Sequence, residues 1–198
     1  MTTNPEPDPF AAVILSGGTG RRLGLIDKSA LIVGGRTLLE RAIGSVLGAE
    51  QIVVVGPAPA AALPIPAGGP PIRFTLEAPV GGGPAAGLLA GRDAMASRVT
   101  RTVVLAVDMP GVNSATIDRL LAAHLDPRDG AFLHGPDGRR QLAGVVSTKA
   151  LDRVRPPTGQ TSGLPMHRLL DLLDLAVVAA VGAEGLDIDT WADLDQHD

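Results

Sequence analysis

The chain has 198 residues, which is enough for one sizeable hydrophobic core and short for two. Its net charge is −4, so no overall basic field exists to attract nucleic acid or an anionic membrane, and we expect neither as a partner. Because it contains no cysteine, the chain cannot form disulfides, thiolate metal sites or cysteine nucleophiles.

The first ten residues, MTTNPEPDPF, are predicted to form a flexible leader (residues 1–10), and residues 11–198 a single domain. The leader lacks the basic and apolar regions of a signal peptide. No apolar run reaches the roughly 20 residues that a membrane-spanning helix needs. We therefore expect a cytoplasmic protein without membrane contact.

After the leader, short apolar runs alternate with helical patterns. Residues 11–15 (AAVIL) form a continuous apolar run, which is typical of a strand buried on both faces. Pro84 suits the first turn of a helix, and Ser114 suits an N-cap. In the first part of the chain, strands are predicted over 11–15, 51–55, 72–77 and 101–107, and helices over 37–47, 84–96 and 114–125.

The remaining part continues the alternation, with strands predicted over 130–134, 141–147 and 175–181, and helices over 165–173 and 189–194. Continuous apolar strands that alternate with helices imply an α/β domain of three layers, with helices on both faces of a mainly parallel sheet. Such sheets bind ligands beyond the C-terminal ends of their strands. The residues that follow predicted strands are therefore the candidates for a site: 16–28, 56, 77–87 and 108–110.

A glycine-rich turn follows the first predicted strand. Gly17, Gly18 and Gly20 lack Cβ atoms, so backbone N–H groups in this turn can wrap an anion. Arg22 offers a planar fork and Lys28 a compact charge to phosphate oxygens. A triphosphate needs such local cations in a chain of negative net charge. The turn therefore predicts phosphate binding.

Two common nucleotide motifs are absent from the sequence. The P-loop needs four residues between its glycines and then Gly-Lys-Ser/Thr, which this turn does not have. The dinucleotide fingerprint needs a third glycine where Leu23 stands. It also needs an acid at the end of the second strand, which is followed instead by Gly56 and Pro57. A nicotinamide or flavin cofactor is therefore not expected.

Residues 15–28, Leu-Ser-Gly-Gly-Thr-Gly-Arg-Arg-Leu-Gly-Leu-Ile-Asp-Lys, resemble the signature of the molybdenum cofactor guanylyltransferases. Further motifs of that family have similar segments here in the same order: Gly-Pro-Ala-Ala-Gly at 83–87, Val-Asp-Met-Pro at 107–110, Asp-Ile-Asp-Thr at 187–190 and Asp-Leu at 193–194. The resemblance covers nearly the whole chain. One departure is clear, because Asp187 and Asp189 stand where the family has two Asn.

The resemblance implies a three-layer α/β/α Rossmann-like nucleotidyltransferase fold and transfer of GMP from Mg-GTP to molybdopterin phosphate, with release of pyrophosphate. The partners it implies are GTP, molybdopterin with or without molybdenum, and transiently the enzymes that deliver or accept the cofactor. Close relatives of that family use CTP, and the pair Gly17-Gly18 is more typical of the guanylyl branch. Another small phosphorylated acceptor, or a nucleotide-binding module without catalysis, stays open as an alternative.

Carboxylates and cations are the candidates for catalysis and metal binding. Asp108 follows the fourth strand, where a carboxylate suits Mg²⁺, although a turn or cap role is the alternative. By analogy with the closing motif, Asp189 is the candidate for a second metal ligand or for a group that positions the acceptor; alternatively, Asp189 or Thr190 caps the last helix. Lys28 and Arg22 would stabilise charge on the α-phosphate and on the departing pyrophosphate. The expected catalytic residues are Arg22, Lys28 and Asp108.

Glu77 aligns with an acid that contacts the guanine nucleotide in the resembled family. A carboxylate can accept hydrogen bonds from guanine N1–H and N2–H₂, a pair that cytosine does not offer; a solvated strand-end acid is the alternative. The expected nucleotide contacts are Leu15, Ser16, Gly17, Gly18, Gly20, Lys28, Gly56, Glu77, Gly83, Gly87 and Asp108. The acceptor candidates, which are as readily explained as surface residues, are Arg139, Arg140, Gln141, His167 and Arg168. Trp191 is expected to cover the core beneath the last helix.

Overall fold

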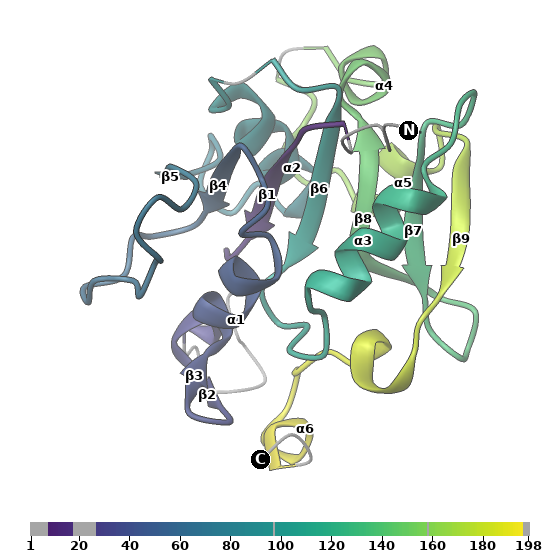
Figure 1. Ribbon diagram of the computed structural model, residues 1–198. Helices are drawn as coiled ribbons and strands as arrows, with labels where there is room; N and C mark the ends of the chain where they lie inside the picture. The colour runs from purple at the N-terminus through teal and green to yellow at the C-terminus, as the bar shows by residue number, and fades with distance from the viewer. Residues whose placement is uncertain (1–7, 18–26, 97, 158, 196–198) are drawn as a thin grey trace, which may run out of the picture.

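The computed structural model describes residues 8–17, 27–96, 98–157 and 159–195 (Figure 1). Its centre is a seven-stranded sheet of order β5-β4-β1-β6-β8-β7-β9. These strands are β1 (Phe10–Leu15), β4 (Gln51–Val55), β5 (Ile72–Thr75), β6 (Arg101–Ala106), β7 (Gly130–His134), β8 (Arg140–Ser147) and β9 (Leu175–Ala179). Of the strands in this sheet, only β8 runs antiparallel to its neighbours. The predicted mainly parallel sheet is confirmed.

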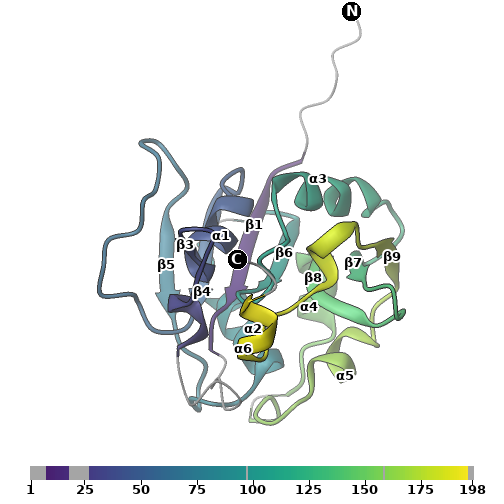
Figure 2. The same ribbon diagram turned by 90° about the horizontal axis from the view of Figure 1, so that it is seen from below.

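Helices cover both faces of the sheet, as the view in Figure 2 shows. One face carries α1 (Leu38–Ser45) and α3 (Ser114–Ala123); the other carries α2 (Pro84–Asp93), α4 (Thr148–Arg153) and α5 (Met166–Leu170). Neighbouring side chains of β1 pack on opposite faces of the sheet. Ile14 packs in the core under α1 and α3, whereas Val13 packs with Leu88 of α2. This alternation explains the continuous apolar run of β1. The predicted three-layer α/β/α arrangement is confirmed.

The strand boundaries agree with the predictions to within one or two residues. The strands predicted over 51–55 and 130–134 begin and end as expected. β5 ends at Thr75 and β9 at Ala179, two residues earlier than predicted. Glu77 therefore does not end its strand but lies in the turn that leads to α2.

Several helix predictions were wrong in detail. The N-cap of α3 is Asn113 rather than Ser114, because the Asn113 side chain accepts the Thr116 N–H and the Thr116 hydroxyl accepts the Asn113 N–H. The helix predicted over 165–173 is confined to α5. Further elements were not predicted, namely α4, the hairpin of β2 (Ile32–Val33) and β3 (Arg36–Thr37), and the 3-10 turns at Lys28–Ala30 and Gly182–Gly185. These elements are too short to show a hydrophobic period.

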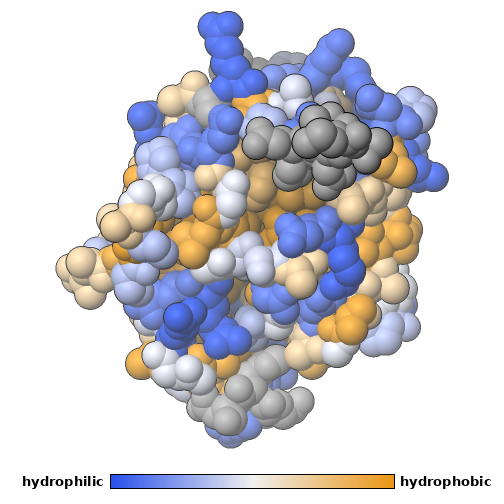
Figure 3. Space-filling model, viewed as in Figure 1, coloured by the Kyte–Doolittle hydropathy of each residue, from blue (hydrophilic) through white to orange (hydrophobic). Residues whose placement is uncertain are grey.

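The last helix, α6 (Trp191–Asp195), lies beyond the ends to which the central strands point (Figure 1). The segment before it therefore passes close to the strand ends that parallel sheets use for ligands. On the face that carries α1 and α3, hydrophilic residues are interspersed with hydrophobic ones (Figure 3). In the described part of the chain, no helix has the length and apolar character needed to cross a membrane.

Candidate active site

The C-terminal ends of the central strands surround a cavity of about 410 Å³. Its walls come from the ends of β1, β4 and β6, from the turn before α2 and from the first turn of α2. The residues singled out in the sequence that line it are Leu15, Gly17, Lys28, Glu77, Gly83, Gly87 and Asp108. These residues are distant in the chain, and the parallel sheet brings them to one edge.

Lys28 is buried in the wall of this cavity. Asp27 caps the 3-10 turn that holds it, since the Asp27 carboxylate accepts the Ser29 N–H at 3.0 Å and the Ser29 hydroxyl at 2.6 Å. Lys28 Nζ donates to Asp108 Oδ2 at 2.9 Å and to Asp189 Oδ1 at 2.6 Å. Burial lowers the pKa of Lys28, but the hydrogen bonds and charges of Asp189 and Asp108 outweigh burial and raise the pKa. The ammonium group is therefore charged at neutral pH.

The backbone of Asp108 is held by contacts with the closing segment of the chain. The Asp108 carbonyl accepts the Ile188 N–H at 2.9 Å, and Ile188 itself is fully buried. The loop after Asp108 packs so tightly that a Cβ on Gly111 would overlap the backbone of Ala183. A hydrogen bond and close packing thus join the strand end to the segment of the closing motif, which is distant in the chain.

Helix capping and metal binding, the two roles considered for the closing motif, fall to different residues. Asp193 Oδ2 accepts the N–H of Thr190 at 2.7 Å, and Thr190 Oγ1 accepts the N–H of Asp193 at 3.3 Å. Thr190 and Asp193 therefore form the reciprocal cap of the last helix. The Asp189 carboxylate reaches Lys28 instead, while its N–H donates to Asp193 Oδ2 at 3.0 Å.

Asp187 belongs to the same acidic group. Partial withdrawal from water raises the pKa of the Asp187 carboxyl, and the like charges of Asp189 and Asp108 raise it further, against the opposing charge of Lys28. The carboxylates of Asp108 and Asp189 thus contact one ammonium group, and Asp187 adds a further negative charge in the same region. This arrangement resembles a cation-binding site more than a simple ion pair.

Glu77 forms the part of the cavity wall near α2. The residue is 8% exposed, and its Oε1 accepts the Gly81 N–H at 3.0 Å. Gly83 precedes α2 with a φ of 93°, a left-handed conformation that favours glycine. Gly87 allows α2 to approach β1, since a Cβ there would lie 3.3 Å from Leu15 Cδ2. The glycines of this turn therefore bring α2 close to the strand ends.

The structure places the other predicted nucleotide contacts differently. Ser16 is buried and does not line the cavity, and neither does Gly56. The two residues pack together, because a Cβ on Gly56 would lie 2.9 Å from the Ser16 Cβ. Their contacts show them shaping the start of the glycine-rich turn. Gly18, Gly20 and Arg22 lie outside the described residues.

Some residues in and around the site were missed because no sequence pattern marks them. Leu142 of β8 lines the cavity from a strand whose apolar residues look like ordinary core. Arg41 of α1 donates to the Pro110 carbonyl at 3.2 Å, and so holds the loop that follows Asp108. A lone arginine on a helix gives no sign in the sequence of which loop it will contact.

Glu184 was also missed, and it anchors the segment that leads into the closing motif. Its carboxylate accepts two hydrogen bonds from the Arg119 guanidinium, at 2.8 and 2.7 Å, one from the Thr116 hydroxyl at 2.6 Å and one from the Val181 N–H at 2.8 Å. The Arg119 hydrogen bonds are the main reason that the pKa of Glu184 falls to about 2. The cluster fixes this segment against α3.

None of the acceptor candidates lines the cavity. Arg140 instead pairs with Asp171 at 2.9 Å, and Arg139 is highly exposed. His167 and Arg168 lie exposed on α5. The expectation for Trp191 was wrong, because this side chain is 49% exposed and the last helix has no buried residue.

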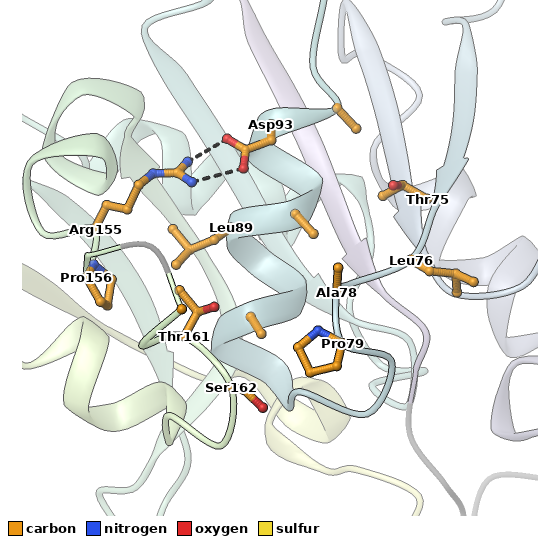
Figure 4. A pocket seen from close by; sticks show the side chains of 14 residues that line it. Thr75, Leu76, Ala78, Pro79, Leu89, Asp93, Arg155, Pro156, Thr161 and Ser162 are labelled. Carbon is orange, nitrogen blue, oxygen red and sulfur yellow. Dashed lines mark hydrogen bonds and ion pairs between the residues drawn. The ribbon is translucent and has the colours of Figure 1, made fainter.

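A second cavity, of about 550 Å³, is lined by residues of α2 and of the segment between β5 and α2, including Leu76 and Ala78 (Figure 4). Asp93 and Arg155 point toward one another at its edge and form two hydrogen bonds, of 2.7 and 2.9 Å. Thr161 and Ser162 come from the loop opposite α2. Residues 78, 79 and 86 of the predicted range 77–87 line this cavity, but none of the expected catalytic residues or named nucleotide contacts that the structure describes does. We therefore place the candidate active site in the first cavity.

The fold is a doubly wound α/β sheet with a cavity at the C-terminal ends of its strands, where such sheets bind nucleotides and other ligands. The chain matches the family of the MobA-like NTP transferase domain over residues 12–175, and it belongs to that family.

Three relatives of known name are similar to the chain. The molybdenum cofactor guanylyltransferase of Acidiphilium cryptum (strain JF-5) is 40% identical over 129 residues, which cover 61% of each protein. The probable molybdenum cofactor guanylyltransferase of Mycobacterium bovis (strain BCG / Pasteur 1173P2) is 34% identical over 183 residues, 89% of this chain and 87% of that one. The nicotine blue oxidoreductase of Paenarthrobacter nicotinovorans is 37% identical over 114 residues, 57% of this chain and 55% of that protein. The chain thus spans less than two thirds of the first and third of these relatives.

Solved structures support the Rossmann-like fold. The homologue of Mycobacterium tuberculosis Rv0371c from Mycobacterium sp. strain JC1 has a TM-score of 0.72 and 20% identity, covering 94% of this chain and 93% of that one. The molybdopterin-guanine dinucleotide biosynthesis protein A of Archaeoglobus fulgidus has a TM-score of 0.68 and 19% identity, covering 94% and 96%. The manganese complex of Rv0371c from Mycobacterium tuberculosis H37Rv has a TM-score of 0.66 and 21% identity, covering 95% and 97%.

The carboxylates of Asp108 and Asp189 suit a divalent cation that is also coordinated by a bound ligand. Oxygens of Asp108 and Asp189 converge on one ammonium group, at 2.9 and 2.6 Å, so the same oxygens can converge on a metal ion. Mg²⁺ in nucleotide sites typically binds one or two carboxylates, and phosphates and water complete its coordination. Among the described residues, no group of three or more His, Cys, Asp or Glu is arranged to hold a metal by itself.

Proposed function

We propose that this protein transfers GMP from Mg-GTP to the terminal phosphate of molybdopterin, forming the guanine dinucleotide cofactor and releasing pyrophosphate. The observation that carries the proposal is the position of Lys28, between Asp108 and Asp189 in the wall of the strand-end cavity. The family and the names of its relatives support this choice of reaction and acceptor.

The cavity supports a position for the guanine nucleotide between β1 and α2. Leu15, Gly17, Gly83 and Gly87 would contact the base and ribose, and Glu77 would accept from guanine N1–H and N2–H₂. Burial of Glu77 strengthens such hydrogen bonds and makes a base that leaves the carboxylate unpaired unfavourable. From the sequence, Gly18, Gly20 and Arg22 would complete the phosphate contacts.

Asp108 and Asp189 would hold Mg²⁺ against the triphosphate. The bound ion supplies positive charge to phosphate oxygens. Lys28 would donate to the α-phosphate or to the departing pyrophosphate, where its charge stabilises the transition state. Because phosphoryl transfer depends mainly on positioning and electrostatics, attack by the acceptor phosphate on the α-phosphorus, opposite the departing pyrophosphate, needs no covalent enzyme intermediate.

We further propose that residues 11–198 act as one cytoplasmic domain, with transient contacts to cofactor-delivery or acceptor enzymes. The seven-stranded sheet supports the single domain, because it joins elements from Phe10 to Ala179.

The oxidoreductase relative raises a second candidate, a redox enzyme built on the same fold. The end of β4 argues against a redox function. β4 ends in Val55 and is followed by Gly56 and Pro57, so no carboxylate stands there to bind a ribose diol. Titration with NAD, NADP and FAD tests this candidate directly. Saturable binding of any of them in the micromolar range would favour the redox function.

The proposed reaction is tested by measuring pyrophosphate release from GTP, CTP, ATP and UTP with Mg²⁺, each with and without molybdopterin. We expect release only with GTP and the acceptor together. Equal or faster release from CTP would make the protein a cytidylyltransferase. GTP binding without release would make it a nucleotide-binding module. The variant Glu77→Gln should lose preference for GTP over CTP, whereas Arg155→Ala, in the second cavity, should keep it.

A further inference from the structure

The ammonium group of Lys28 is the only cationic side chain that the described residues place between the two candidate metal ligands. Its Nζ donates to Asp108 Oδ2 at 2.9 Å and to Asp189 Oδ1 at 2.6 Å. The lysine side chain is 10% exposed, against 23% for Asp108 and 43% for Asp189. Both carboxylates are thus partly open to solvent, and that of Asp108 lines the cavity, while the ammonium fills the space between them.

The two acids have fixed backbones, whereas the lysine has a flexible stem. Ile188, buried between Asp187 and Asp189, donates its N–H to the Asp108 carbonyl at 2.9 Å. The N–H of Asp189 donates to Asp193 at 3.0 Å. The four-carbon stem of Lys28 can swing without moving either acid. The ammonium is therefore the partner that can leave.

We propose that Lys28 is an internal counter-ion that occupies the place of the divalent cation, so that the metal binds well only when a triphosphate is present to take the ammonium. This inference rests on the proposed function for the identity of the site. An ammonium and a metal ion compete for the same oxygens of Asp108 and Asp189. When both ligands arrive, the metal takes the carboxylates and Lys28 takes the phosphate oxygens, so every charge keeps a partner.

The exchange couples the two ligands. A triphosphate that draws Lys28 away raises the affinity for the metal, and by linkage the metal raises the affinity for the triphosphate by the same factor. Asp189 strengthens this coupling in the present chain, because an Asn at that position would leave the ammonium one carboxylate instead of two. Metal-free triphosphate is disfavoured, since it meets the charges of Asp108, Asp187 and Asp189.

The test measures Mn²⁺ binding to the free protein, without nucleotide or acceptor, by electron paramagnetic resonance. Lys28→Met removes the competing ammonium, and we expect it to bind Mn²⁺ at least about tenfold more tightly than the unmodified chain. It should bind metal-free GTP about tenfold more weakly, because the phosphates lose a cation. Lys149→Met, in the only other lysine of the chain, removes the same charge from an exposed position and should change neither affinity.

Two further variants guard against misfolding of Lys28→Met. Lys28→Gln keeps a hydrogen-bond donor without the charge and should also tighten Mn²⁺ binding. Asp189→Asn should bind metal-free GTP more tightly, because the lysine is held by one carboxylate only. Folded Lys28 variants that bind Mn²⁺ no more tightly than the unmodified chain would overturn the inference. Since this measurement uses the metal alone, its result is independent of whether GMP transfer is found.

Discussion

Two ion clusters, one around Glu184 and one around Lys28, show opposite balances of charge. Glu184 is buried and receives two hydrogen bonds from the Arg119 guanidinium, so one negative group faces one positive group. Lys28 is also buried, but it faces the carboxylates of both Asp108 and Asp189. Both clusters join segments that are distant in the chain.

The ratio of acidic to basic groups indicates that the Glu184 cluster is structural and that the Lys28 cluster is functional. The acid of the first cluster is saturated by hydrogen bonds, and a saturated ion pair holds its segments in one geometry. The second cluster has more acid than base, and excess carboxylate attracts a further cation. Excess negative charge beside a cavity therefore favours a role in binding. We therefore expect variants of the two clusters to affect different quantities.

The largest effect is expected on catalysis at the Lys28 cluster. Asp108→Ala and Lys28→Ala should each lower kcat/KM for GTP by on the order of 10²-fold or more, because each removes charge that stabilises the transition state. Pyrophosphate release gives the rate, and a thermal melt shows whether the variants stay folded. Lys149→Ala is the matched control. A folded Asp108→Ala variant with normal activity would show that this carboxylate binds no essential metal.

The next effect is expected on stability at the Glu184 cluster. Folding lowers the pKa of Glu184 from 4.5 to about 2, so its contribution is complete above pH 4.5 and is lost as the pH falls toward 2. Glu184→Gln should lower the free energy of unfolding by roughly 3 kcal/mol at pH 7. Urea unfolding at several pH values measures this, and the loss should shrink between pH 4.5 and 2.

An exposed glutamate provides the control for that measurement. Glu50 lies on the surface, and Glu50→Gln should leave the free energy of unfolding nearly unchanged at every pH. Similar losses in the two variants would mean that general charge effects, rather than the Arg119 pair, control the acid stability. The comparison between the clusters would then fail.

A smaller effect is expected where the two clusters meet. A Cβ on Gly111 would overlap the backbone of Ala183, next to Glu184, so Gly111→Ala must push the Asp108 loop away. We expect a loss of about 1–3 kcal/mol in unfolding free energy, together with lower activity. Gly44→Ala in α1 is the control, because no atom lies within 4 Å of a Cβ there. Calorimetry and pyrophosphate release on both variants give the two readouts.

The smallest effect is expected at the second cavity. Arg155 and Asp93 form an ion pair that is partly open to water, with side-chain exposures of 31% and 63%. Arg155→Ala should therefore cost less than about 1 kcal/mol of stability and leave kcat and KM for GTP unchanged. A clear rise in KM for GTP would place part of the nucleotide site on this side of the turn.

Much of the fold was predictable because it is local. Continuous apolar runs such as 51–55 marked the strands, since a strand covered by helices on both faces needs apolar residues at every position. The N-caps of helices were harder to predict. Asn113 and Ser114 are both good N-caps by type, and only the reciprocal bond with Thr116 distinguishes them. The short helix α4 lacked a visible period and was missed.

Part of the candidate site was also predictable. The glycine-rich turn, Lys28, Glu77 and Asp108 could be singled out because residues that follow parallel strands gather at one edge of the sheet. Ser16 and Gly56 occupy equivalent sequence positions, yet they pack against each other and do not line the cavity. Position after a strand is known from the sequence, whereas the direction of a side chain depends on its neighbours.

The sequence by itself determined the class of fold, the family and the group of residues around which a site had to form. These properties follow from hydrophobic periodicity and from short motifs, which are local. Only the tertiary structure decided that Thr190 caps the last helix and that the Asp189 carboxylate reaches Lys28, 161 positions away. The physical reason is that charge interactions act through space, so their partners are set by which chain segments the sheet brings together.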